Sequence, residues 1–134
     1  MNKLKLACLA TCLVSGIASA APSCDGFQLK LKNTLNEDLL VTTIKLDGAQ
    51  IQPGLIEKLN ANSEQVFTVN GSAENLPMVG EFRLHTISVP TKTLVIKYTM
   101  DNKTAMCEHT DQSEPTDMGI EKSRTVGGVE YLIK

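Results

Sequence analysis

Short segments in which apolar and polar residues alternate follow one another along most of this chain. The segment 27–32, FQLKLK, has an apolar residue at every second position, and the segments 80–89 and 93–100 repeat the pattern. A two-residue period is that of a β-strand with one buried and one solvated face. No stretch of ten or more residues carries the apolar stripe of an amphipathic helix. The pattern therefore predicts an all-β fold.

Turn residues divide the chain into about seven or eight short strands, which is typical of an antiparallel β-sandwich. Asp47-Gly48 and Asn70-Gly71 end two of the expected strands, and Pro53-Gly54 marks a turn. The residues after this turn, 55–59, are expected to form a helical turn or a rim loop. Near the C-terminus, Gly127-Gly128 is expected to be a two-residue hairpin loop, because glycine tolerates positive φ.

The first twenty residues have the features of a secretory signal peptide. Lys3 and Lys5 precede an apolar run, and Ala18-Ser19-Ala20 supplies the small residues of a signal-peptidase site. We expect cleavage after Ala20, so that residues 21–134 form a single β-sandwich domain in the periplasm or outside the cell. A membrane anchor is the alternative, although the apolar run is shorter than the roughly 20 residues that span a bilayer.

Cleavage at this site reduces four cysteines to two. Cys8 and Cys12 lie in the leader, which leaves Cys24 and Cys107 in the mature domain. Two cysteines in an exported protein most simply pair with each other, so one disulfide is predicted. A free thiol pair, a metal pair and lipidation of Cys24 are the alternatives, but no C-x-x-C motif lies nearby and the residues before Cys24 do not match a lipidation site.

The charge of the mature domain says little about a partner. Removal of the two leader lysines leaves 11 basic residues against 15 acidic ones, a formal net charge of −4. Nucleic acids are bound through clustered Lys and Arg, so no nucleic-acid partner is expected. The chain also lacks Trp, and its few Phe and Tyr residues mostly fall on expected core faces. A lectin that stacks sugars on exposed rings is therefore disfavoured.

A polar run near the C-terminus, CEHTDQSEPTDMG at 107–119, raises the question of a metal site. Its candidate ligands are Asp111, Glu114 and Asp117. Calcium loops place about six to eight oxygens around an obligatory Gly, and zinc needs several convergent ligands. No Gly lies at the bend, and Cys107 is expected in the disulfide. We expect a solvated loop and no cofactor.

No catalytic motif surrounds a serine or a histidine. His85 and His109 are the only histidines, and no G-x-S-x-G turn is present. We expect His85 on a strand face. Two carboxylates could converge to form a hydrolase site, but a small sheet domain leaves little room for a deep cleft. The prediction is that the protein is not an enzyme.

Two segments, 49–63 and 72–79, remain for recognition. They carry apolar side chains outside the clearest alternating pattern, and four of these form the candidate interaction surface: Leu55, Ile56, Leu76 and Met78. The alternative is that the same side chains cap the ends of the sandwich.

A series of short motifs suggests a family. They are Asn33 after the first strand, L-x-G at 46–48, I-x-P-G at 51–54, A-x-S-x-x-x-F at 61–67, Gly71, and G-x-F-x-L at 80–84. Together they resemble the small secreted aegerolysin and actinoporin-like β-sandwich proteins, and the resemblance implies lipid recognition and membrane permeabilisation with partner proteins. Those families carry many Trp and Tyr residues in lipid-facing loops, whereas this chain has no Trp. A membrane lipid is therefore a disfavoured partner.

The leading hypothesis is an exported bacterial protein that acts as a non-catalytic interaction module for a protein or surface ligand, including one on a host. The leader and the small disulfide-linked domain are also similar to substrates that Gram-negative bacteria export through the periplasm. The first alternative is a lipid-binding, cytolysin-like protein, and the second is a small metal-dependent hydrolase that uses the acidic run. The sequence identifies neither the partner nor the oligomeric state.

Overall fold

The computed structural model describes residues 23–72, 77–104 and 106–134. The predicted leader, residues 1–20, and Leu76 of the candidate interaction surface lie outside these described residues. Within the described ranges, no helix is long and apolar enough to cross a membrane.

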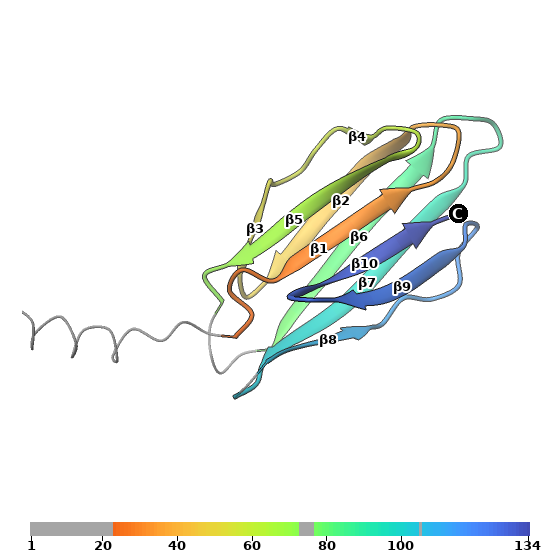
Figure 1. The fold of residues 1–134 in the computed structure, drawn as a ribbon. Helices are drawn as coiled ribbons and strands as arrows, with labels where there is room; N and C mark the ends of the chain where they lie inside the picture. The colour runs from red at the N-terminus through yellow and green to blue at the C-terminus, as the bar shows by residue number, and fades with distance from the viewer. Residues whose placement is uncertain (1–22, 73–76, 105) are drawn as a thin grey trace, which may run out of the picture.

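The described residues form ten strands in two five-stranded sheets (Figure 1). The strands are β1 Gln28–Asn33, β2 Leu39–Asp47, β3 Gln50–Gln52, β4 Lys58–Leu59, β5 Ser63–Asn70, β6 Met78–Thr86, β7 Thr93–Asn102, β8 Cys107–Asp111, β9 Ile120–Thr125 and β10 Gly128–Ile133. The first sheet has the order β3-β5-β1-β10-β9, and the second has the order β4-β2-β6-β7-β8. All strand pairs are antiparallel except β1 with β10, which is parallel.

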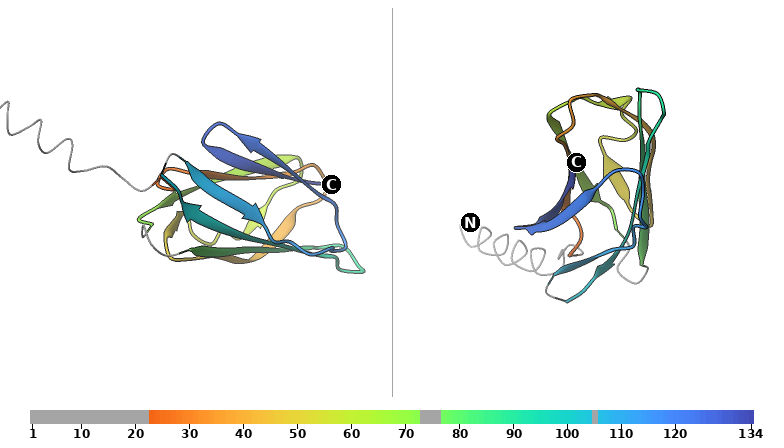
Figure 2. Two further views of the ribbon diagram at one scale, coloured as in Figure 1. Left: turned by 90° about the horizontal axis from the view of Figure 1, so that it is seen from below. Right: turned by 90° about the vertical axis from the view of Figure 1, so that its right-hand side faces the viewer.

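The two sheets pack face to face, which confirms the predicted all-β sandwich (Figure 2). Alternate residues of each long strand enter the core, as the two-residue period requires. On β7 these are Leu94, Ile96, Tyr98 and Met100, all fully buried or nearly so. Ring contacts link the sheets, because Phe67 of β5 and Phe82 of β6 lie 5.2 Å apart between ring centroids.

The predicted disulfide is present between Cys24 and Cys107. Their sulfur atoms lie 2.08 Å apart, and both residues are buried. Cys24 precedes β1 of the first sheet, and Cys107 opens β8 of the second. The disulfide therefore links the segment before β1 to β8, an edge strand of the opposite sheet.

The C-terminal hairpin turns one residue earlier than predicted. Its loop is Val126-Gly127, because Thr125 pairs with Gly128. Gly127 has φ of 73°, which suits a glycine, whereas Gly128 already belongs to β10. A β-carbon at Gly128 would overlap the carbonyl oxygen of Gln28. The second glycine is thus required by the close approach of β1, a contact that the local sequence does not reveal.

Of the helical turn or rim loop predicted at 55–59, the structure has a loop at 55–57, and Lys58 and Leu59 form the short strand β4. The loop leaves β3 in the first sheet and enters β4 in the second, where Lys58 and Leu59 pair with β2. The segment passes from one sheet to the other along the side of the sandwich (Figure 1).

Candidate functional site: the outer face of the second sheet

The outer face of the second sheet is the side turned away from the core. On β6 it carries Val79, Glu81, Arg83 and His85, and on β7 it carries Thr93, Val95, Lys97 and Thr99; on β2 it includes Leu40, Thr42, Thr43, Lys45 and Asp47. These residues alternate with buried ones, so the strand period itself directs them outward. The outer face is therefore built on three central strands with rigid backbone.

A hydrogen-bonded row of three side chains crosses one end of the outer face. The hydroxyl of Thr42 donates to the carbonyl of Arg83 at 3.3 Å and lies 3.1 Å from Nε2 of His85. Nδ1 of His85 lies 3.0 Å from the hydroxyl of Thr93, so each ring nitrogen is within hydrogen-bond distance of a threonine hydroxyl. His85 lies on a strand face, as expected, with both ring nitrogens occupied.

A strand irregularity brings Thr42 into this row. The register of β2 against β6 shifts between Val41 and Thr43, which is the signature of a β-bulge. Thr42 is the extra residue of this bulge, and its side chain is exposed beside His85. The bulge is thus the local feature that places the hydroxyl.

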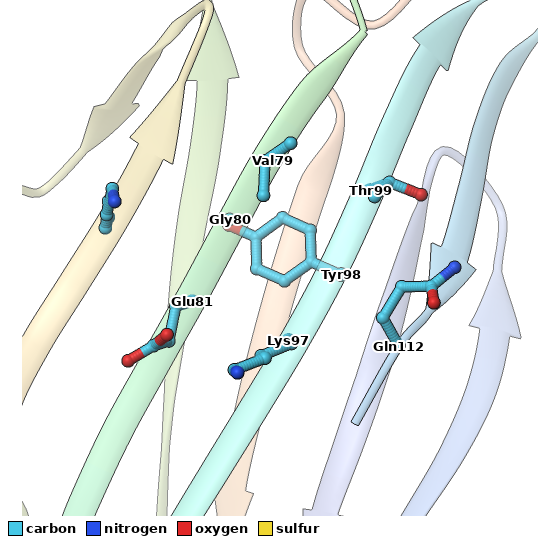
Figure 3. Close-up of a pocket in the computed structure, with 8 residues that line it drawn as sticks. Val79, Gly80, Glu81, Lys97, Tyr98, Thr99 and Gln112 are labelled. Atoms are coloured by element: carbon cyan, nitrogen blue, oxygen red, sulfur yellow. The ribbon is translucent and has the colours of Figure 1, made fainter. Parts of the chain in front are cut away.

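A hollow of about 240 Å³ opens near the middle of the outer face (Figure 3). It is lined by Lys45, Val79, Gly80, Glu81, Lys97, Tyr98, Thr99 and Gln112. Gly80 and Tyr98 are paired across β6 and β7, and the Tyr98 ring extends over Gly80, where a β-carbon would overlap it. The ring fills the space that Gly80 leaves in the core, so the tyrosine belongs to the packing beneath the hollow.

A second hollow, of about 210 Å³, adjoins the first along β7. Its lining consists of Arg83, Val95, Lys97, Glu114, Pro115 and Thr116. Lys97 lines both hollows. The two hollows therefore form a shallow depression with a lysine at its junction.

Residues 112–117, which we call the wall segment, border this depression. Its backbone continues along β7 where β8 stops: the Gln112 N–H donates to the carbonyl of Lys97 at 2.7 Å. The Ser113 hydroxyl accepts from the N–H of Lys97 at 3.0 Å, and an Asp117 carboxylate oxygen accepts from the N–H of Thr93 at 3.1 Å. Side chains thus take over the pairing that a longer β8 would have provided.

The charged side chains of the outer face differ in their pairing. Arg83 pairs with Glu81 at 3.1 Å, and Lys45 lies 3.5 Å from Asp47. For the Lys97 ammonium, no carboxylate among the described residues lies within 4.0 Å. The junction of the two hollows therefore carries a cation that makes no direct ion pair among the described residues, although Glu81 stands opposite it on β6 and Glu114 lines the second hollow.

Two of the three weak candidate metal ligands, Asp111 and Asp117, accept hydrogen bonds from the backbone of this region. Asp111 accepts a hydrogen bond from the N–H of Ser113 at 2.9 Å, and Asp117 binds Thr93 as described above. Glu114 lies on the rim of the second hollow. Across residues 23–72, 77–104 and 106–134, no group of three or more His, Cys, Asp or Glu side chains is placed to hold a metal ion.

Of the candidate interaction residues, the structure describes Leu55, Ile56 and Met78, and these three differ in exposure. Met78 is fully buried in β6, where it pairs with Met100, and Ile56 packs partly against the core. Leu55 is 64% exposed on the connection between β3 and β4. For Met78 and Ile56, the capping alternative describes the structure better than an exposed anchor does.

His109 is a buried residue that the sequence did not single out beyond its place in the polar run. Its ring lies between those of Phe27 and Tyr98, at centroid distances of 5.9 and 5.3 Å, and its Nε2 lies 3.1 Å from the hydroxyl of Tyr131. Burial, with smaller contributions from Lys122 and Arg124, lowers the pKa of His109 to about 4. Its position two residues after the buried Cys107 is the signal that could have indicated an inward side chain.

No protein-family model matches the chain, and no curated protein is significantly similar to it. The functional argument therefore depends on the residues and on their geometry.

Proposed function

We propose that this protein is an exported, non-catalytic binding protein that recognises a partner protein through the outer face around Lys97. The observation that carries the proposal is the Lys97 ammonium, which makes no direct ion pair among the described residues and stands at the junction of two hollows. Val79 borders one hollow, and Val95 and Pro115 border the other. A partner with a carboxylate flanked by small apolar groups fits this surface, because opposite charge fixes the register of a protein interface.

The polar groups of the outer face support binding over catalysis. His85 already has a threonine hydroxyl at each nitrogen, and the Asp117 carboxylate accepts from backbone. The floor of the depression is strand backbone at Gly80 and Tyr98. Such a rigid surface holds side chains in place for recognition at little cost in conformational entropy.

The test is site-specific photocrosslinking in the compartment where the protein resides. A photoreactive benzophenone residue at Thr99 is expected to capture a partner, and the additional Lys97→Glu change is expected to reduce capture by about tenfold or more. Lys32→Glu is the matched control, because Lys32 is an exposed lysine on the outer side of the first sheet. Equal capture by the Lys97→Glu and Lys32→Glu proteins would refute the proposal.

A lipid-binding function is the second candidate, and two exposed turn residues favour it. Met106 is 53% exposed on the turn between β7 and β8, and Val126 is fully exposed on the turn between β9 and β10. A single surface depression is lined by Met106 and by Gly127, so these two apolar turns lie close together at the end that holds the disulfide. Apolar turn tips of this kind can insert into the interface of a bilayer.

Sedimentation with phosphatidylcholine vesicles, with and without phosphatidylserine, tests this candidate. Val126→Asp is expected to abolish binding, whereas Val89→Asp, at a residue that is 92% exposed at the opposite end, is expected to leave it intact. Absence of binding to both vesicle types would remove the lipid candidate. Calorimetric titration with Ca²⁺ and Zn²⁺ tests the metal-dependent hydrolase, which predicts heat and a higher melting temperature.

A further inference from the structure

Strand β9 is the longest of the four edge strands of the described sandwich. The other edge strands are shorter: β3 has three residues, β4 has two and β8 has five. In contrast, the six residues of β9 pair with β10 on one side, and the described chain adds no strand on the other (Figure 1). An edge of this length is a template for an added strand.

The hydrogen-bond pattern shows which backbone groups face outward. Gly119 and Lys134 exchange both of their backbone hydrogen bonds, at 2.8 and 3.0 Å. In an antiparallel pair such residues alternate with residues whose N–H and C=O groups point away from the neighbouring strand. The backbone groups of Ile120, Lys122 and Arg124 therefore point away from β10, toward the open edge.

The same three residues turn their side chains toward the inner side of the sheet. They stand opposite Ile133, Tyr131 and Val129, all of which are buried. The Arg124 guanidinium lies 5.2 Å from the centre of the Phe27 ring and donates to the carbonyl of Cys107 at 3.3 Å. Neither Lys122 nor Arg124 has a carboxylate within 4.0 Å among the described residues, whereas Glu121 pairs with Lys134.

These charges disfavour a second copy of the chain at this edge. Symmetric antiparallel pairing about Lys122 places the two Lys122 side chains opposite each other, and pairing about Ser123 places Lys122 opposite Arg124 of the other copy. Pairing about Glu121 sets two glutamates opposite each other. Directly opposed like charges destabilise a strand pair, so the registers with the greatest overlap are all penalised.

We propose that β9 binds an extended segment of another protein whose acidic residues occupy two alternate positions, with an apolar residue at the next alternate position. In the antiparallel arrangement, the first acid faces Arg124, the second faces Lys122, and the apolar residue faces Ile120. Backbone hydrogen bonds supply the attachment, and the two charge pairs select the sequence. This surface is independent of the depression around Lys97, since β9 and β7 belong to different sheets.

The probe is the peptide Thr-Glu-Thr-Glu-Thr-Val-Thr-amide with fluorescein in place of an acetyl group at its N-terminus, and its control carries Lys in place of both Glu residues. Fluorescence anisotropy at low salt is expected to show binding of the acidic peptide about tenfold or more tighter than that of the control. The double variant Lys122→Glu, Arg124→Glu is expected to reverse this preference, and Lys97→Glu is expected to leave it unchanged. The reversal keeps the test valid, because a misfolded variant binds neither peptide selectively.

Amide hydrogen exchange locates the bound peptide. Protection is expected at the N–H groups of Ile120, Lys122 and Arg124, and it is expected to disappear when the peptide residues that face them are N-methylated. The proposal is overturned if the acidic peptide does not bind at about 1 mM, if both peptides bind equally, or if protection appears on another strand. It is equally overturned if the protein dimerises through β9.

Discussion

The hydroxyl of Tyr131 on β10 lies 3.1 Å from Nε2 of His109 on β8, so this contact joins the two sheets through the core. The imidazole is only 7% exposed, between the rings of Phe27 and Tyr98. The charged groups that act on it are Lys122, Arg124 and Asp111, of which the two cations disfavour protonation and Asp111 favours it. The folded state thus keeps His109 neutral well below the pH at which an exposed histidine protonates.

This histidine makes the stability of the fold dependent on pH. Its pKa falls from 6.5 in the unfolded chain to about 4 in the folded state, so the unfolded chain binds the extra proton between these values. The free energy of unfolding is unaffected by this group above pH 6.5 and decreases as the pH drops toward 4. The total decrease is about 3 kcal/mol. Urea unfolding from pH 7 to pH 4 measures it. An equally steep decline in a His109→Gln protein would contradict this assignment.

Two buried tyrosines give a matched pair of substitutions. Tyr131→Phe removes the hydrogen bond to His109 and is expected to lower the free energy of unfolding by about 1 kcal/mol. The Tyr98 hydroxyl is also buried but has no hydrogen-bond partner among the described residues. Tyr98→Phe is therefore expected to leave stability unchanged or to raise it. Chemical denaturation of both variants measures the difference, and a larger loss for Tyr98→Phe would contradict the prediction.

Gly80→Ala tests the packing of β6 against Tyr98. The added methyl group would overlap the tyrosine ring, and the cost of such overpacking is about 1–3 kcal/mol. Gly54→Ala is the control, because no atom lies within 4 Å of a β-carbon at that position and no unusual φ occurs there. Thermal unfolding should show a lower melting temperature for Gly80→Ala alone. Equal melting temperatures would mean that the ring moves away freely.

The disulfide is expected to stabilise the fold by restricting the unfolded chain. Cys24 and Cys107 are separated by 83 positions, and a loop of this length contributes about 4 kcal/mol in the chain-entropy model. Replacement of both cysteines by Ala should lower the free energy of unfolding by that amount. Mass spectrometry of the oxidised protein should show a mass two hydrogens below that of the reduced form. Two thiols that react with an alkylating agent before reduction would contradict the bond.

The long central strands could be predicted because their signal is local. In the segment 93–100 every second residue is apolar, and in 80–89 Phe82 and Leu84 alternate with polar residues; β7 and β6 bury these side chains. The start of β8 at Cys107 follows a backbone turn in which the N–H of Lys103 donates to the carbonyl of Met106 at 3.0 Å. Strand ends of this kind depend on hydrogen bonds that the alternation of residues does not encode.

Non-local contacts account for what could not be predicted. Nothing near β1 or β10 indicates that they pair in parallel, and β3 and β4 are too short to give a period. The outer face shows the same limit. The sequence indicates only that Lys97 is one outward residue of a strand. Its place in a hollow depends on the wall segment, which pairs along β7. Asp117 reads as a candidate ligand but caps a backbone N–H.

The parallel pairing of β1 with β10 has a consequence for the order in which the molecule assembles. β1 is the first strand in the sequence, but in space it is the middle strand of its sheet, between β5 and β10. It cannot gain its second neighbour until residues 128–133 are available. A chain still being synthesised therefore has an incomplete first sheet until β10 has been made, and the described sandwich closes only then.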